Sequence, residues 1–379
     1  MKILFWLSAI IIIYTYIGYP ILVYLLSLLY KKPLKGKYIY PELSILIAAY
    51  NEEKNIENKI KSLLEIDYPE ERFELLIGSD GSTDRTYEIA SKYINGKVKL
   101  FRNLNRQGKP SMLNLLAANA KGEILVFTDA RQRLDKNALK ELVKHFGDGR
   151  VGSVSSSLFY ENENHDNKTG AGIGLYWKYE KFIRKSESRM GSMLGATGAL
   201  YAIRRELFPK LPNNLILDDV FIPMKIVERG LRAIFDKKAK IYDRVFNDPK
   251  EEFFRRARTL AGNYQLFYYF RSLFNPFKGK ISWQFFSHKF LRLMVPFFLV
   301  LLFASNIFLT ASKFYLIMFM LQVTFYASGL LGLLFKRKIK ILDVPYMFCV
   351  MNSAAVVGLY ELLMHKQNAL WRKAEAVHS

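Results

Sequence analysis

Two adjacent carboxylates, Asp218 and Asp219, lie between apolar residues in the stretch 216–223. Acidic side chains are rarely buried without a partner, so the pair requires an explanation. One interpretation is structural, because an aspartate at the N-cap of a helix accepts a hydrogen bond from a free backbone N–H. An N-cap would explain only one of the two carboxylates and leave the other without a structural reason. We therefore predict that Asp219 is a general base and that Asp218 orients or tunes it.

Further polar residues follow short apolar runs that are typical of buried strands. These residues are Asn51 and Glu52 after the run 42–50, Asp80 in the turn-rich segment after the run 73–78, and Asp129 after the run 124–128. Helical patterns separate the runs, and this alternation predicts an α/β domain with a parallel, doubly wound sheet. Ligands of such domains bind at the carboxyl ends of the strands, so we expect these side chains to share one edge of the sheet.

Composition favours a membrane protein with a large folded domain. The 379 residues are 51% hydrophobic, and 56 Lys+Arg against 34 Asp+Glu give a net charge of +22. This charge fits nucleic acid, an anionic membrane face or a phosphorylated substrate. The basic residues gather near the apolar segments and no nucleic-acid recognition motif is found, which favours membrane lipids and argues against nucleic acid. The single cysteine, Cys349, excludes an intramolecular disulfide.

Residues 1–30 predict an N-terminal transmembrane helix, because a bilayer core needs roughly 20 apolar residues in a helix. The apolar run is longer than that of a cleaved signal peptide, and no small-residue cleavage site follows it. Lysines gather directly after it, in 31–37. The positive-inside rule then places the following domain, residues 38–265, in the cytoplasm.

A second apolar block fills the C-terminal end of the chain. Residues 293–335 predict two transmembrane helices, and 266–292 carry the Trp, Phe and Lys/Arg mixture of interfacial helices. The segment 341–364 is interrupted by Asp343 and Pro345, so we expect a partial or re-entrant helix rather than a third span. Basic residues lie in 336–340 and in the tail 365–379.

Six short motifs occur in an order that resembles the family-2 inverting glycosyltransferases, including the membrane-anchored cellulose, hyaluronan and poly-N-acetylglucosamine synthases. The motifs are Tyr50-Asn51-Glu52-Glu53, Ser79-Asp80-Gly81-Ser82-Thr83-Asp84, Gly108-Lys109-Pro110, Thr128-Asp129-Ala130, Asp218-Asp219 and Arg255-x-x-Arg258. The resemblance covers Leu43 to about Gln265. It implies a GT-A fold, which is Rossmann-like and doubly wound, flanked by transmembrane helices.

The resemblance implies a nucleotide-diphosphate sugar, UDP-linked in the synthases, as the donor. The positions that match the donor pocket are Asn51, Glu52, Asp80 and Lys109. Asp129 resembles the first aspartate of the family's Asp-x-Asp motif, which would hold Mg²⁺ or Mn²⁺ on the diphosphate. Arg131 stands where the second aspartate is expected. Either Asp129 binds the metal alone, or Arg131 neutralises part of the phosphate charge.

On the acceptor side, Asp219 resembles the base of the family's Thr-Glu-Asp motif. Gly198 belongs to a small-residue loop, 195–199, that would approach the donor sugar. Arg255 and Arg258 align with the Gln-x-x-Arg-Trp motif, in which the arginine holds the diphosphate. Thr259 replaces the tryptophan, which weakens the case for a processive polymer synthase.

We therefore predict a membrane glycosyltransferase that transfers a sugar to a polysaccharide or to a lipid-linked acceptor, in the synthesis of cell-envelope or extracellular polysaccharide. The alternative is a non-catalytic, membrane-anchored protein that binds nucleotide sugars. Arg131 keeps this alternative open, because it removes a carboxylate that the family uses for the metal.

Overall fold

The computed structural model describes residues 1–34, 37–161, 171–244, 249–334 and 340–364. The chain divides into two units. Among the described residues, the sheet unit comprises 30–34, 37–161 and 184–244, and the helical unit comprises 1–29, 171–183, 249–334 and 340–364. The basic tail 365–379 and most of the basic run 336–340 lie outside the described residues.

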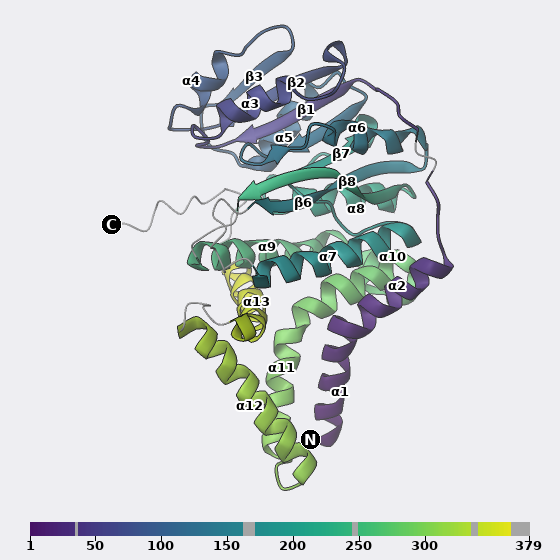
Figure 1. Cartoon of the computed structure of the whole chain (residues 1–379), viewed down its shortest axis with the longest axis vertical. Helices are drawn as coiled ribbons and strands as arrows, with labels where there is room; N and C mark the ends of the chain where they lie inside the picture. Colours follow the sequence, from purple (N-terminus) through teal and green to yellow (C-terminus); the bar gives the residue numbers. More distant parts are fainter. Residues whose placement is uncertain (35–36, 162–170, 245–248, 335–339, 365–379) are drawn as a thin grey trace. The chain divides into compact units, whose positions relative to one another are not determined.

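An eight-stranded sheet forms the centre of the sheet unit, with the strand order β3-β2-β1-β4-β7-β6-β8-β5 (Figure 1). The strands are β1 (Leu43–Ala49), β2 (Phe73–Asp80), β3 (Val98–Asn103), β4 (Ile124–Thr128), β5 (Arg133–Leu134), β6 (Val151–Glu161), β7 (Leu200–Arg204) and β8 (Arg232–Arg244). Every residue of β1 is buried, which explains the continuous apolar run that predicted it.

The prediction of a parallel sheet is correct for β3, β2, β1 and β4 and for the pair of β6 and β8, and it has to be corrected for β7 and β5. Strand β7 is antiparallel to both β4 and β6, and β5 is antiparallel to β8. The sheet is therefore mixed. The sequence did not reveal β8, because its solvent-facing lysines interrupt the apolar pattern.

Short helices cover the sheet. They are α3 (Ile56–Leu64), η2 (Glu70–Arg72), α4 (Thr86–Ser91), α5 (Lys109–Ala118), α6 (Ala138–Val143), η3 (Lys144–Gly147), η5 (Arg205–Leu207), α8 (Asp218–Glu228) and the last part of α7 (Ala171–Met190). Helix α5 packs on β1 and β2, while α6 and α8 pack on β6 and β8. The apolar stripe Ile56, Ile60 and Leu63 of α3 is fully buried, as its spacing predicts.

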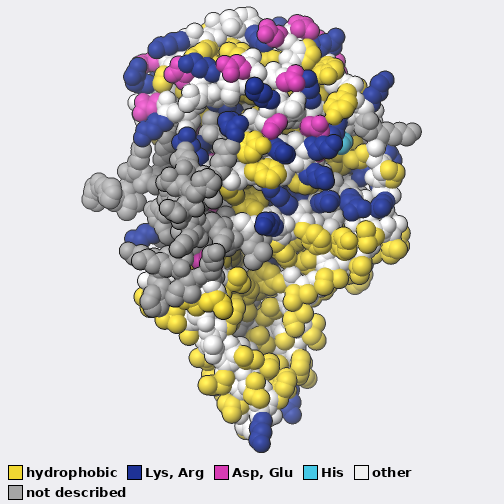
Figure 2. Space-filling view, in the orientation of Figure 1, with side chains coloured by type: hydrophobic (Ala, Val, Ile, Leu, Met, Phe, Trp, Pro, Cys, Tyr) yellow, Lys and Arg dark blue, Asp and Glu magenta, His cyan; other side chains and the backbone are white. Residues whose placement is uncertain are grey.

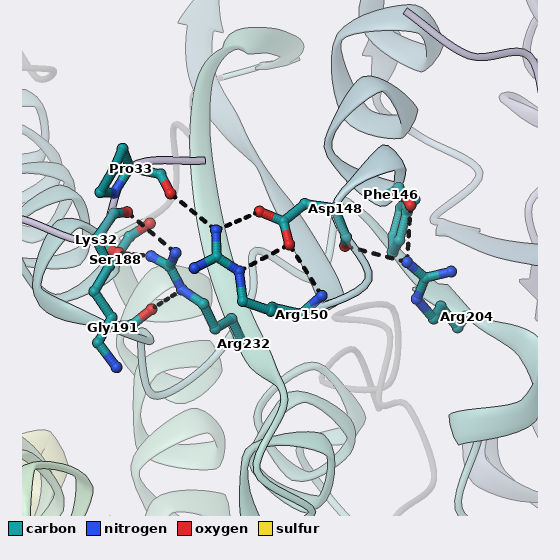
Figure 3. A network of polar contacts seen from close by, with 9 residues as sticks. All are labelled: Lys32, Pro33, Phe146, Asp148, Arg150, Ser188, Gly191, Arg204 and Arg232. Carbon is teal, nitrogen blue, oxygen red and sulfur yellow. Dashed lines mark hydrogen bonds and ion pairs between the residues drawn. The ribbon is translucent and has the colours of Figure 1, made fainter. Parts of the chain in front are cut away.

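Three arginines of the sheet unit donate to backbone carbonyls, and two of them fix the segment that follows the first apolar helix (Figure 3). Arg232 bonds the carbonyl oxygen of Lys32 at 3.1 Å, and Arg150 bonds that of Pro33 at 3.1 Å. Arg204 reaches the Phe146 carbonyl at 2.8 Å. Some of the basic residues, which composition led us to expect at membrane lipids, therefore form hydrogen bonds within the protein instead.

The helical unit consists of long helices with apolar side chains over much of their surface (Figure 2). Its elements are α1 (Lys2–Ile13), η1 (Tyr14–Gly18), α2 (Tyr19–Leu29), the first part of α7, α9 (Pro249–Tyr269), η6 (Arg271–Phe274), η7 (Pro276–Lys278), α10 (Lys280–Gln284), η8 (Phe285–Phe290), α11 (Leu291–Ile307), α12 (Lys313–Leu334) and α13 (Lys340–Leu363). Helix α1 packs against α11, and α13 packs against α9 and α12.

Four helical segments of the described chain are long and apolar enough to cross a membrane: Lys2–Leu29, Lys280–Ile307, Lys313–Leu334 and Ile341–Leu363. The second begins thirteen or so residues earlier than the sequence pattern indicated, because α10, η8 and α11 run on as one helix. Helix α13 continues through Asp343 and Pro345, so neither residue shortens it. A partial or re-entrant segment stays a prediction.

Candidate active site

The polar residues that follow strands gather at one edge of the sheet. Strand β1 pairs in parallel with β2 on one side and with β4 on the other. Asn51 follows β1, Asp80 ends β2 and Asp129 follows β4. Since the carboxyl ends of neighbouring parallel strands share an edge, the structure brings these three residues together as the sequence predicts.

Asn51 and Glu52 hold the turn that follows β2. Asn51 has φ 53°, an uncommon value for a residue other than glycine. Its Oδ1 accepts from the Thr83 backbone N–H at 2.9 Å, and its own backbone N–H donates to Ser82 Oγ at 3.2 Å. The Glu52 N–H donates to Thr86 Oγ1 at 2.7 Å. Any contact that these two residues make with a donor stays a prediction.

Asp80 is fully buried and supports the loop that leads to Lys109. One oxygen accepts from the backbone N–H of Gln107 at 2.9 Å, and the other from that of Gly108 at 2.7 Å. Gly108 precedes α5 with φ 94°, a value that favours glycine. In this geometry Asp80 fixes the start of α5. Its contact with a nucleotide stays a prediction.

Lys109 connects Asp129, at this edge of the sheet, to Asp218 of the adjacent pair. Its Nζ lies 3.0 Å from Asp129 Oδ1 and 3.3 Å from Asp218 Oδ1. Burial works against the charge of this ammonium group, but Asp129, Asp218 and Asp219 outweigh it and raise the pKa of Lys109 above its usual value. The ammonium group therefore stays charged while it bridges two carboxylates.

The structure distinguishes the two adjacent carboxylates. Asp218 is 5% exposed and accepts from the Tyr201 hydroxyl at 3.2 Å in addition to its contact with Lys109. Asp219 is half-buried. Helix α8 begins at Asp218 and its N-cap is Leu217, so the N-cap interpretation of the pair does not apply. Acidic side chains still suit this first turn, because the N-terminal end of a helix is electropositive.

The loop 195–199 packs directly against Asp219. The Ala196 N–H donates to the Asp219 carbonyl at 2.7 Å. A Cβ atom on Gly198 would lie 2.9 Å from Asp219 Oδ2, so a side chain there would push the carboxylate aside. The Thr197 hydroxyl accepts from Arg184 Nη1 at 2.9 Å. Gly198 thus lies beside the predicted base. The expected approach of this loop to a donor sugar stays a prediction.

Arg131 turns toward β8. Its Nε and Nη2 donate to the two oxygens of Asp243 at 3.0 and 2.8 Å, a bidentate pair. Gln132 Nε2 donates to the same carboxylate at 3.1 Å. Nearby, the buried Lys59 donates to Thr128 Oγ1 and to the Gln132 carbonyl, both at 2.8 Å.

Sequence reasoning did not find Lys59, Tyr201 or Asp243, because each lies far along the chain from its partner. It also missed Arg106. The Arg106 guanidinium lies 3.7 Å from the centre of the Tyr50 ring, and its Nε and Nη2 are buried without a hydrogen-bond partner. The Tyr50 motif and a basic residue just before Gly108 were the available signals.

Arg255 and Arg258 belong to α9 of the helical unit. Arg255 Nη2 lies 2.6 Å from Glu252 Oε2, and Arg256 pairs with the same carboxylate. The prediction that Arg255 and Arg258 hold a diphosphate is not tested by these contacts. It stays a prediction.

The carboxylates near Lys109 suit a divalent metal that is completed by substrate. Within the described parts of the chain, no group of three or more His, Cys, Asp or Glu side chains could hold a metal ion. Asp129 and Asp218 nevertheless share one cation, the ammonium group of Lys109. Mg²⁺ commonly takes one or two carboxylates and fills its remaining positions with water and substrate phosphates. The donor set fits that pattern.

Comparison with known proteins agrees with the motifs and the fold. The profile of "Glycosyl transferase family 2" matches residues 44–211. The chain is 25% identical, over 63% of its length, to a probable glycosyltransferase YdaM of Bacillus subtilis (strain 168). It is 23% identical, over 63% of its length, to the poly-beta-1,6-N-acetyl-D-glucosamine synthase of Staphylococcus aureus (strain COL). It spans 59% and 58% of these two relatives.

Among solved structures, the chain resembles the mannosyltransferase PcManGT of Pyrobaculum calidifontis, determined in complex with GDP-Man and Mn²⁺. The TM-score is 0.72 at 23% identity, and the match covers 95% of this chain and 100% of that one. This similarity shows the fold, which is GT-A. The matching profile shows that residues 44–211 form a glycosyl transferase family 2 domain, and the mixed sheet agrees with the GT-A fold of the solved structure.

Proposed function

We propose that the protein is a membrane-bound inverting glycosyltransferase that uses a nucleotide-diphosphate sugar and works at the cytoplasmic face. The observation that carries the proposal is the arrangement of three carboxylates around Lys109. Asp218 is buried and contacts Lys109 and Tyr201, whereas Asp219 is half-buried beside a loop without bulky side chains. The two carboxylates therefore differ in burial, and the partly exposed one lies beside a loop that leaves room for a substrate.

The proposed reaction is a single displacement. An acceptor hydroxyl attacks the anomeric carbon of the donor sugar while the bond from that carbon to the diphosphate breaks, which inverts the configuration. Asp219 accepts the proton of the hydroxyl, and a base in this role must lie within hydrogen-bond reach of it. Lys109 lies beside Asp129 and can stabilise negative charge on the leaving diphosphate.

Asp129, with Asp218 close by, would hold a divalent cation, Mg²⁺ or Mn²⁺. When bound, such a cation neutralises the charge of the diphosphate as it departs. Arg131 contributes differently, because its guanidinium is held by Asp243. We propose that Arg131 orders the wall next to Asp129, rather than that it replaces the missing carboxylate as a phosphate ligand.

Two acceptors remain in the proposal, a polysaccharide and a lipid-linked sugar acceptor, both in cell-envelope or extracellular polysaccharide synthesis. The relative named as a poly-N-acetylglucosamine synthase supports the first. The replacement of the family tryptophan by Thr259 supports single transfers over processive synthesis. Four helices able to span a membrane fit either acceptor.

The test is the transfer of radiolabelled sugar from a panel of UDP and GDP sugars in membranes that contain the full-length protein. Asp219→Asn should reduce transfer by about 10³-fold, because the amide cannot accept the proton. Asp67→Asn is the matched control, since Asp67 is exposed and pairs with Lys140 in the same unit. It should transfer like the wild type.

Equal transfer by Asp219→Asn and the wild type would contradict the proposed base. Nucleotide-sugar binding without transfer from any donor would favour the alternative, a non-catalytic binding protein. Transfer that survives removal of divalent cations by a chelator would contradict the metal. The size and extractability of the labelled product, lipid or polymer, would identify the acceptor.

A further inference from the structure

The Lys109 ammonium group occupies the position that a cation shared by Asp129 and Asp218 would take. It lies 3.0 Å from one carboxylate and 3.3 Å from the other, and its side chain is 16% exposed. A divalent cation that contacts both carboxylates would have to lie where the ammonium group lies. Two positive groups this close would also repel each other. Binding of one therefore disfavours the other.

The geometry also lets the ammonium group leave without unfolding the site. The backbone before Lys109 is fixed, because Asp80 accepts from the N–H groups of Gln107 and Gly108. The side chain itself is a flexible four-carbon stem that carries a point charge. Its ammonium group can therefore move to another anion while α5 stays in place.

Charge balance indicates what would move it. Asp129, Asp218 and Asp219 all act on the Lys109 charge. A nucleoside diphosphate brings at least two more negative charges, and one ammonium group cannot balance both sets. A diphosphate oxygen offers Lys109 a charge-assisted hydrogen bond in place of Asp129. The vacated Asp129 oxygen, together with the diphosphate, then suits a hard divalent cation.

We propose that Lys109 competes with the divalent cation for Asp129, so that the cation binds tightly only after a nucleoside diphosphate has drawn the ammonium group away. This deepens the proposed function and rests on it for the identity of the ligands. The site itself then sets the order of binding, in which the nucleoside diphosphate binds before the divalent cation. Cation and nucleotide are then positively coupled, and the coupling is reciprocal.

The experiment measures Mn²⁺ binding to the full-length protein in detergent micelles, from the electron paramagnetic resonance signal of free Mn²⁺, with and without UDP or GDP. Without nucleotide, Lys109→Met should bind Mn²⁺ about tenfold more tightly than the wild type. Adding UDP or GDP should tighten Mn²⁺ binding of the wild type about tenfold and that of Lys109→Met much less.

Two variants control this measurement. Lys99→Met removes a lysine of the same unit that is paired with Glu74 at 2.6 Å, and it should bind Mn²⁺ like the wild type. Combining Lys109→Met with Asp129→Asn should abolish the increase in Mn²⁺ affinity, because Mn²⁺ would bind to the Asp129 carboxylate. Lys109→Gln gives the same comparison if thermal unfolding shows that Lys109→Met does not fold.

Equal Mn²⁺ affinity of the wild type and Lys109→Met without nucleotide would overturn the proposal. A gain that survives Asp129→Asn would overturn it as well. Both results concern binding and need no turnover. They can therefore be separated from a failure of the proposed transfer, which the radiolabel assay reports.

Discussion

The guanidinium of Arg131 is held by a carboxylate on a distant strand. Asp243 has 3% of its side chain exposed and accepts both bonds of the pair. Removing the positive partner of a buried carboxylate leaves an uncompensated charge. The arginine at the third position of the metal motif is thus paired with a residue that the motif does not contain.

We expect Arg131→Asp, which restores the Asp-x-Asp pattern, to destabilise the protein by roughly 2–4 kcal/mol, because it places a second carboxylate beside the buried Asp243. Thermal unfolding in detergent measures this. The charge-exchanged double variant Arg131→Asp with Asp243→Arg should recover part of the loss. An unchanged melting temperature for the single variant would show that the pair contributes nothing.

Lys59 predicts a pH dependence of stability. Burial lowers the pKa of its amine to about 7, although Asp129 and Asp243 act against that shift. In the unfolded chain the pKa is about 10.4. Below pH 7 the Lys59 amine is charged in both the folded and the unfolded state, and the folded state bears the full cost of burying that charge. Between pH 7 and about 10 the unfolded state holds more protons, so stability rises with pH.

Accordingly, the wild type should gain about 1.4 kcal/mol of unfolding free energy per pH unit above pH 7 relative to Lys59→Met. The loss of the bonds to Thr128 and Gln132 shifts that variant by a constant amount and leaves this slope unaffected. Lys61→Met, on the same helix but exposed, should follow the wild type. Parallel pH profiles for the wild type and Lys59→Met would contradict the shifted pKa.

At the scale of elements, the end of α7 supports the loop beside the predicted base. Arg184 donates to Thr197, and the Thr197 N–H donates to Ser155 Oγ at 2.9 Å. These bonds fix the loop whose Gly198 abuts Asp219. We expect Arg184→Leu to lower kcat about tenfold while the donor KM stays near its wild-type value, since misplacement of a catalytic group costs rate.

Steady-state transfer kinetics check this expectation, with two comparisons. Arg184→Lys should restore part of kcat, because an ammonium group can also donate to Thr197. Lys185→Leu changes the neighbouring exposed residue of α7 and should leave kcat unaltered. A rise in donor KM with unchanged kcat would instead assign Arg184 to donor binding.

The elements that the sequence predicted well are those with a strong local period. Strands β1, β2 and β4 are buried on both faces, and α3 has an apolar stripe, so their patterns are unambiguous. Strand β8 was missed because three exposed lysines lie in it, and its pairing with β6 provides the support that its own sequence lacks. The direction of β7 likewise depends on its neighbours.

For the whole molecule, the proposed topology predicts which positions face the cytoplasm. In a Cys349→Ser background, Leu104→Cys presents a thiol at a position that is 82% exposed in the sheet unit. Only a membrane-permeant maleimide should label it in intact cells, because the positive-inside rule places this unit in the cytoplasm. Ser312→Cys, between α11 and α12, should react with an impermeant maleimide. The reverse labelling pattern would contradict the orientation.

The sequence by itself determined the α/β class, the polar residues at strand ends, the apolar helices and the family resemblance, because each depends on residues that are close along the chain. Tertiary structure decided which carboxylate is buried. Tyr201 and Lys109 reach Asp218 from β7 and α5, whereas Asp219 is half-buried. It likewise paired Arg131 with Asp243. Such contacts join distant positions, and only the packed sheet brings these partners within hydrogen-bond distance.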